Sequence, residues 1–188
     1  MRLLRDRIDP LEALRTYARV QVRAGFLQGE RLLAELVEVA SEDQGAGGPV
    51  GVASDVLAQA NADARAEQQG WPEVTDHDRR QAAFGRMRAD GIEVLEGVDD
   101  HWRASAELER LDDAGTPVRG IVWFTLPDVW HAVDHGMLEV NLWHGDSANV
   151  ASGDALLDRV ILSFAEEGLH AHFVEGRIEV AASWQRRL

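Results

Sequence analysis

The chain has 188 residues and a formal net charge of −14, from 33 acidic and 19 basic residues. Its hydrophobic fraction of 45% is sufficient for a folded core, and no apolar run approaches the roughly 20 residues of a membrane helix. The absence of cysteine excludes disulfides, cysteine-ligated zinc and a thiol nucleophile, and the charged N-terminus lacks a signal-peptide core. We therefore expect a soluble, cytoplasmic protein with no membrane partner.

All 19 basic residues are arginine, which excludes a Schiff-base lysine or a phosphate-loop lysine. The acidic residues concentrate at 24–78 and 90–113, and Arg79, Arg80, Arg86 and Arg88 lie between these stretches. We interpret these arginines as a solvent-exposed helix face, because so few cations in an acidic chain make a poor phosphate-binding surface. No nucleic-acid partner is expected.

The first part of the chain is predicted to be helical. Asp9 and Pro10 are typical of a helix start, and Gly25 of a helix end. Apolar residues at helical spacing predict helices at 10–24, 30–40 and 54–69. The glycine-rich residues 41–51 are predicted to form a flexible loop, and Gly70-Trp71-Pro72 to end the third helix.

The pattern beyond residue 74 alternates between helix and strand. Thr75 and Asp78 are predicted to cap a helix whose buried stripe contains Ala83, Phe84 and Met87. Further helices are expected at 102–114, 128–135 and 154–167, the last capped by Ser152 or Gly153, with strands at 92–95, 120–126 and 137–144.

The chain is predicted to close with a β-hairpin that turns at Glu175-Gly176. A two-residue turn at this position sets the pairing of the two strands. Residue 173 then pairs with 178 and residue 171 with 180 on the inner face, and His172 lies opposite Glu179 on the outer face. The fold class is therefore α+β: N-terminal helices followed by a roughly five-stranded mixed sheet with helices packed on it. We expect an N-terminal helical region at 1–70 and an α+β domain at 71–188, with one compact unit as the alternative.

The segment Trp71-Pro72-Glu73-Val74-Thr75-Asp76-His77-Asp78-Arg79, followed by Ala82-Ala83-Phe84 and Gly91-Ile92, resembles an actinobacterial family of uncharacterised proteins defined as a domain of unknown function. The similarity extends over nearly the whole chain and implies no activity. Many members of that family carry a cysteine-rich segment after the Gly-Ile strand, and residues 96–102 of this chain contain no cysteine. A metal or redox role is therefore not carried over from the resemblance.

Thr75, Asp76, His77 and Asp78 could form an acid–base cluster, but Asp76 and Asp78 lie about 200° apart around a helix. Helix capping accounts for Thr75 and Asp78 without chemistry. The remaining family-motif positions, Trp71, Pro72 and Arg79, indicate no reaction either.

Two histidine sets could bind a metal ion. Asp128, His131 and His135 share one helix face at ligand spacing, and His170, His172 and Glu179 share the outer face of the hairpin. Each set also has an ordinary structural explanation, as a surface helix or as an exposed cross-strand pair.

No catalytic set stands out, so we expect neither a metal nor a cofactor. The leading hypothesis is a non-catalytic protein–protein interaction or regulatory domain that self-associates, for example as a homodimer, or binds a basic partner. The alternative is a metal-dependent enzyme that uses one of the two histidine sets.

Overall fold

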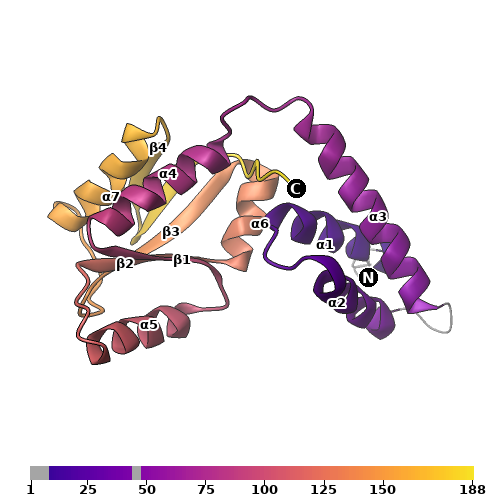
Figure 1. Cartoon of the computed structure of the whole chain (residues 1–188), viewed down its shortest axis with the longest axis horizontal. Helices are drawn as coiled ribbons and strands as arrows, with labels where there is room; N and C mark the ends of the chain where they lie inside the picture. Colours follow the sequence, from indigo (N-terminus) through magenta and orange to yellow (C-terminus); the bar gives the residue numbers. More distant parts are fainter. Residues whose placement is uncertain (1–8, 44–47) are drawn as a thin grey trace, which may run out of the picture. The chain divides into compact units, whose positions relative to one another are not determined.

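The computed structural model describes residues 9–43 and 48–188 (Figure 1). The chain divides into two compact units. The first comprises the described residues up to Trp71 together with the last two residues, and the second comprises Pro72–Arg186. Within the described residues, no helix is both long enough and apolar enough to cross a membrane.

The first unit consists of three helices, α1 (Pro10–Ala24), α2 (Gly29–Asp43) and α3 (Pro49–Gln68). Asp9 caps α1 by accepting a hydrogen bond from the backbone N–H of Leu11, and Gly25 ends the helix in the left-handed conformation at φ 76°. Buried residues recur every three or four positions along each helix, so one stripe of each faces a shared core. The core residues are Leu14, Ala18, Val22, Leu32, Leu36, Ala40, Ala53, Val56, Ala60 and Ala64.

The loop predicted at 41–51 is too long. Helix α2 continues to Asp43, and α3 begins at Pro49, five residues before the predicted start. Proline suits the first turn of a helix because its missing N–H would have no partner there. Residues 44–47, the centre of the predicted loop, lie outside the described residues.

The second unit confirms the α+β prediction. Its elements are α4 (Asp76–Ala89), β1 (Ile92–Val98), α5 (His101–Asp113), β2 (Gly120–Thr125), α6 (Leu126–His135), β3 (Met137–His144), α7 (Ala155–Glu166), β4 (His170–Val174) and β5 (Arg177–Ala181). The strand order is β1-β2-β3-β5-β4, with β1 and β2 parallel and the other pairs antiparallel. The hairpin has the predicted register, and His172 is opposite Glu179.

Helices cover the two faces of the sheet unequally. Helices α4 and α7 lie on one face, where Phe84 and Phe164 from the helices meet Phe124 from β2 (Figure 1). Helix α5 covers the other face over β1 and β2, and its Leu108 belongs to the same buried cluster as Trp123. Over β3, β4 and β5 that second face carries charged residues instead, so the sheet has an uncovered polar half.

The tight packing of this sheet is visible at Gly120, the first residue of β2. A Cβ atom at this position would lie 2.5 Å from the carbonyl oxygen of Trp143 and 2.6 Å from a methyl carbon of Leu156. Only a residue without a side chain therefore fits between β3 and α7 here.

Three element boundaries differ from the prediction. Strand β1 continues to Val98. Helix α6 begins at Leu126, two residues before the predicted start, because its N-cap Thr125 forms a capping box with Asp128. Asp154, and not Ser152 or Gly153, occupies the N-cap position of α7; its carboxylate accepts the backbone N–H of Ala151, before the helix, and makes no capping hydrogen bond to the first turn.

Candidate functional site

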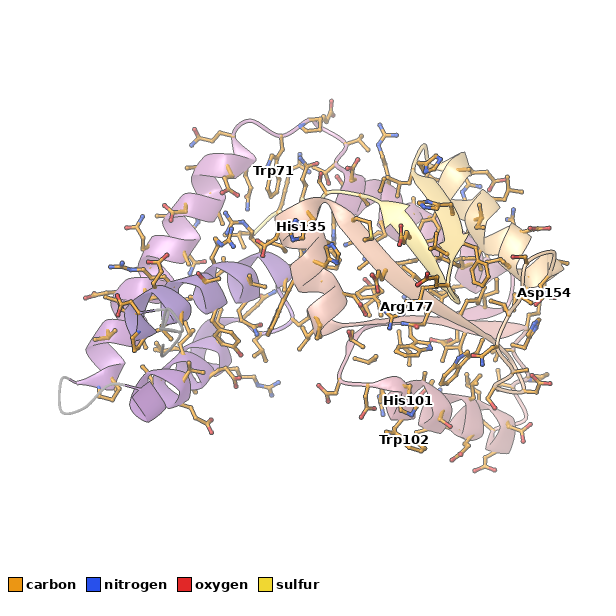
Figure 2. The ribbon with its side chains drawn as sticks, turned by 180° about the vertical axis from the view of Figure 1, so that it is seen from behind. Trp71, His101, Trp102, His135, Asp154 and Arg177 are labelled. Carbon is orange, nitrogen blue, oxygen red and sulfur yellow. The ribbon has the colours of Figure 1, made fainter. Side chains whose placement is uncertain are left out.

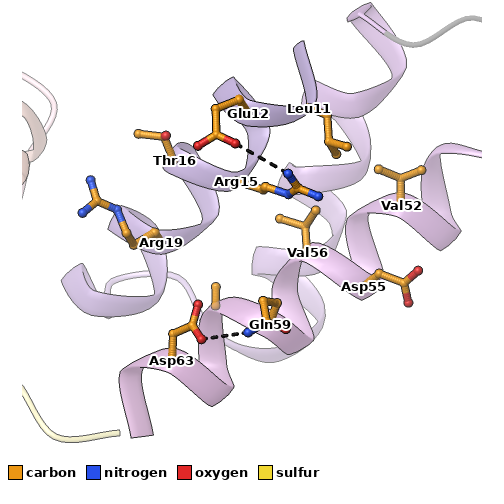
Figure 3. Close-up of a pocket in the computed structure, with 11 residues that line it drawn as sticks. Leu11, Glu12, Arg15, Thr16, Arg19, Val52, Asp55, Val56, Gln59 and Asp63 are labelled. Carbon is orange, nitrogen blue, oxygen red and sulfur yellow. Dashed lines mark hydrogen bonds and ion pairs between the residues drawn. The ribbon is translucent and has the colours of Figure 1, made fainter. Parts of the chain in front are cut away.

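An open groove runs between α1 and α3 in the first unit, with a volume of about 770 Å³ (Figure 3). Its apolar lining consists of Leu11 from α1 and Val52, Val56 and Ala60 from α3. A concave apolar floor between two helices is the shape into which an amphipathic helix packs.

Opposite charges border the groove on its two sides. Helix α1 contributes Arg15 and Arg19 together with one carboxylate, Glu12, and α3 contributes Asp55 and Asp63 (Figure 3). Arg15 is paired with Glu12 on its own helix at 3.5 Å, and both side chains are more than half exposed. Such an exposed pair contributes little free energy, so Arg15 can exchange it for a better partner at low cost.

Of the residues on which the predicted resemblance rests, Thr75, Asp76, Asp78 and Arg79 lie at the N-terminus of α4, and each makes a structural hydrogen bond. Thr75 and Asp78 form the predicted capping box: the Asp78 carboxylate accepts the backbone N–H and the hydroxyl of Thr75, and Thr75 Oγ1 accepts the N–H of Asp78. Asp76 accepts the backbone N–H of Ser183 at 3.0 Å. Arg79 donates to the carbonyl oxygen of Glu167 at 3.1 Å.

Trp71 and Pro72 lie at the junction between the two units, at the end of the first and the start of the second. The backbone N–H of Trp71 donates to the carbonyl oxygen of Gln68 at 3.2 Å, which continues the turn that ends α3. The motif therefore marks a helix end and a helix start, and its two aspartates do not converge on a common site.

Arg80 overturns the interpretation of the arginines as a solvent-exposed face. Its side chain is 0% exposed, and its guanidinium carbon lies 3.7 Å above the centre of the Trp184 ring. Nη2 lies 2.5 Å from Nδ1 of His77, whereas Nε and Nη1 are buried without a hydrogen-bond partner. Burial lowers the pKa of Arg80 to about 10, against the opposing charges of Glu96 and Asp76. The charge nevertheless remains on the guanidinium at neutral pH.

Of the other three arginines of α4, Arg86 and Arg88 are exposed and Arg79 is half-buried, and all three contact acceptors in the second unit. Arg86 pairs with Glu167 at 2.5 Å and with Glu166 at 3.5 Å, and Arg88 pairs with Glu96 at 3.5 Å. The solvent-exposed interpretation therefore fails at one position of four, the position that continues the buried stripe of the helix.

The two histidine sets are not arranged as metal centres. Among the residues that the structure describes, no group of three or more histidine, aspartate or glutamate side chains could hold a metal ion. His131 and His135 lie close, with ring centres 4.8 Å apart, but the carboxylate of Asp128 accepts the backbone N–H and hydroxyl of Thr125 as part of the α6 cap. Figure 2 shows His135 at the end of that helix.

On the hairpin, His172 and Glu179 form the predicted cross-strand pair, with Nε2 and Oε2 3.3 Å apart. Arg177 pairs with Glu139 on the same face, so the directly opposed carboxylates of Glu139 and Glu179 each have a cationic or ionisable neighbour. Figure 2 shows Arg177 on the side of the sheet where α5 lies. The uncovered half of the sheet is thus a ladder of cross-strand pairs.

A second concavity, of about 860 Å³, lies between α5 and the turn after β3. His144 in its lining pairs with Asp154 at 3.2 Å. The N–H of Ala151 and the His144 ring together lower the pKa of the Asp154 carboxyl. Ser147, also in the lining, has a positive φ of 66°, but within the described residues its hydroxyl makes no hydrogen bond to His144. A histidine–aspartate pair without an attached hydroxyl is not a nucleophilic triad.

Comparison with known families gives one match. The sequence model of a family described as "Domain of unknown function (DUF6891)" matches residues 8–188. The chain belongs to the DUF6891 family. Searches of curated proteins and of solved structures find no match to this family member. The family assignment agrees with the predicted resemblance to a domain of unknown function and adds no chemistry to the geometry.

Sequence reasoning missed the two features with the clearest geometry. The α1–α3 groove depends on the side-by-side placement of helices that are about 40 residues apart in sequence, for which no local pattern exists. The burial of Arg80 was detectable, because it lies three and four residues before Ala83 and Phe84 on the predicted buried stripe.

Proposed function

We propose that this DUF6891 protein acts by protein–protein contact, and that the α1–α3 groove is the contact surface. The observation that carries the proposal is the combination of an apolar floor with oppositely charged sides. A helix laid into the groove would cover Leu11, Val52 and Val56 and would meet a fixed pattern of charge at its edges.

The occupant that fits best is a second copy of the chain. A twofold symmetric dimer brings the same surface patch together from both copies. Packing α1 of one copy against α3 of the other places Arg15 and Arg19 beside Asp55 and Asp63, and the symmetry repeats these contacts. The net charge of −14 opposes this association at long range, and salt at physiological concentration screens that repulsion beyond roughly 8 Å.

The same charge makes nucleic acid an unfavourable partner in this proposal, because affinity for phosphates comes from cationic surfaces. The metal-dependent alternative receives no support from a specific contact. In the described part of the chain, Asp128 caps α6 and Glu179 pairs with a single histidine.

Sedimentation equilibrium of the full chain over a wide concentration range tests the proposal. We expect a reversible dimer that the double variant Arg15→Glu with Arg19→Glu dissociates. Adding Asp55→Arg and Asp63→Arg to that variant exchanges the two sides of the groove and should restore dimerisation. The matched control is Arg31→Glu with Arg65→Glu, which changes two exposed arginines of the same unit outside the groove.

The proposal would be contradicted by a monomer at every concentration, by an equal loss of association in the control, or by a failure of the charge exchange to restore association. Circular dichroism of each variant checks that its helices remain folded. A charge-reversal variant that remains folded and remains dimeric would place the dimer contact elsewhere on the chain.

A further inference from the structure

A small basic cluster lies in the second unit of this acidic protein. Its members are Arg80 and His77 on α4, which contact each other and the ring of Trp184, and Arg186, which follows Trp184 by two residues and whose charge acts on the His77 ring. None of the described carboxylates lies within ion-pair distance of Arg80 or Arg186.

The guanidinium of Arg80 has more N–H donors than there are acceptors within hydrogen-bond distance. A guanidinium has five N–H donors in a fixed planar fork, and His77 accepts from Nη2 only. Nε and Nη1 stay buried without a partner. Burying a cation in this way is costly, and a fork of unused donors has the geometry that binds a carboxylate or a phosphate group through two parallel hydrogen bonds.

The nearest carboxylates are engaged elsewhere. Asp76 accepts the backbone N–H of Ser183, and Glu96 accepts the side-chain amide of Gln81 at 2.7 Å. Their charges act on Arg80 from a distance, but neither oxygen reaches its free donors. These two residues hold the surroundings of Arg80 in place without neutralising it.

His77 adds a further donor to the cluster. Burial, together with the nearby charge of Arg80, lowers the pKa of His77 to about 4, so the ring is neutral at pH 7. Because Nδ1 accepts from Arg80, the ring proton resides on Nε2, which is then a donor. The positive charge of Arg186 also acts on this ring.

We propose that Arg80, His77 and Arg186 form a binding site for a compact oxyanion, a phosphate or carboxylate group. The anion would take the free donors of Arg80 and the charge of Arg186. This site does not depend on the groove proposed as the dimer contact, because all of its residues belong to the second unit.

Access to Arg80 involves the segment at 182–186, which is in neither a helix nor a strand. Trp184, 5% exposed, covers the face of the guanidinium, and the hydrogen bond from Ser183 to Asp76 holds the segment against α4. An anion that reaches Nε and Nη1 displaces this segment, so binding and a change around Trp184 occur together.

Titration of the full chain with inorganic phosphate tests the site, with the arginine Nε–H and tryptophan Nε1–H resonances followed by NMR. The same titration is carried out with acetate and with chloride at matched ionic strength. We expect saturable shifts at Arg80 and Trp184, with a dissociation constant between roughly 0.1 and 10 mM. Binding by phosphate alone, by acetate alone or by both identifies the group that the site accepts, and chloride is expected to cause no saturable shift.

Variants locate the site. Arg80→Met should abolish saturable binding, and Arg186→Gln should weaken it by roughly tenfold, the loss of one charge-assisted contact. Arg103→Gln, a change at an exposed arginine of α5, should leave it unchanged. If Arg80→Met does not fold, the variant Arg186→Gln, at a half-buried position, decides.

Two outcomes would overturn the proposal. One is the absence of a saturable shift for phosphate and acetate up to roughly 50 mM, well above any physiologically useful dissociation constant. The other is binding that Arg186→Gln leaves at full strength, or that Arg103→Gln weakens as much as Arg186→Gln does, because either result would contradict a site defined by Arg80 and Arg186.

Discussion

The most direct consequence of the buried arginine concerns the pH dependence of stability through His77. The pKa of His77 is lowered from 6.5 to about 4, first by burial and second by the charge of Arg80. In the unfolded chain the histidine takes up a proton as the pH falls through 6.5, and in the folded chain it does so only near pH 4. The contribution of the neutral His77 ring to the free energy of unfolding is therefore fully present above pH 6.5 and is lost as the pH falls toward 4.

The size of the effect follows from the shift. A difference of about 2.5 pH units corresponds to about 3 kcal/mol of unfolding free energy. The ring is half-buried, so solvent screens part of the interaction and this figure is an upper bound. Carboxylates also titrate below pH 5, so the contribution of His77 must be measured as a difference between proteins.

Urea denaturation of the wild type and of His77→Gln at pH 7, 5.5 and 4 isolates this difference. Glutamine retains an acceptor for Arg80 but has no proton to gain, so the variant should gain stability relative to the wild type by up to about 3 kcal/mol as the pH falls to 4. The exposed His101→Gln is the control. A direct NMR titration that gives His77 a pKa at or above 6.5, or a difference in stability that is constant with pH, would refute the reasoning.

Four further predictions concern stability. Thr75→Ala removes a helix cap that is fully buried and should cost about 1–2 kcal/mol, measured by urea denaturation, and no change would show that the capping box is dispensable. Phe84→Ala empties the centre of the core and should cost about 3–5 kcal/mol in the same assay. Gly120→Ala places a methyl group 2.5 Å from the Trp143 carbonyl oxygen and should cost about 1–3 kcal/mol or more, seen as a lower melting temperature. Arg80→Met replaces a buried cation that lacks an ion pair, so stability should rise by about 1–4 kcal/mol at neutral pH, and a loss of that size would instead show that Arg80 has a structural role.

Most of the fold could be predicted because its signals are local. The Thr75–Asp78 cap, the alternating residues of β3 and the two-residue turn at Glu175 each occupy a few neighbouring residues and fix the backbone there. The errors concern element ends. The start of α6 was predicted two residues late, because a second cap identical in type to the first was not recognised at Thr125.

The candidate sites could be predicted much less well, since they depend on long-range contacts. A charge count treats Arg80 and Arg86 alike, yet one is buried against Trp184 and the other is an exposed ion pair with Glu167. The indole that covers Arg80 comes from a segment more than 100 residues away, so no window of sequence around α4 contains it. The net charge of −14 likewise conceals a local cationic cluster.

The capping box at Thr75 explains why the adjacent residues Arg79 and Arg80 differ in burial. The cap fixes the first helical residue at Asp76, and from there each residue advances the helix by about 100°. Arg80 then falls on the stripe of Ala83 and Phe84, facing the core, whereas Arg79 reaches the end of α7. A helix that started one residue later would turn every side chain by the same angle and remove Arg80 from Trp184. The capping box therefore sets the phase of α4, and through that phase it places the guanidinium of Arg80 in the interior of the second unit.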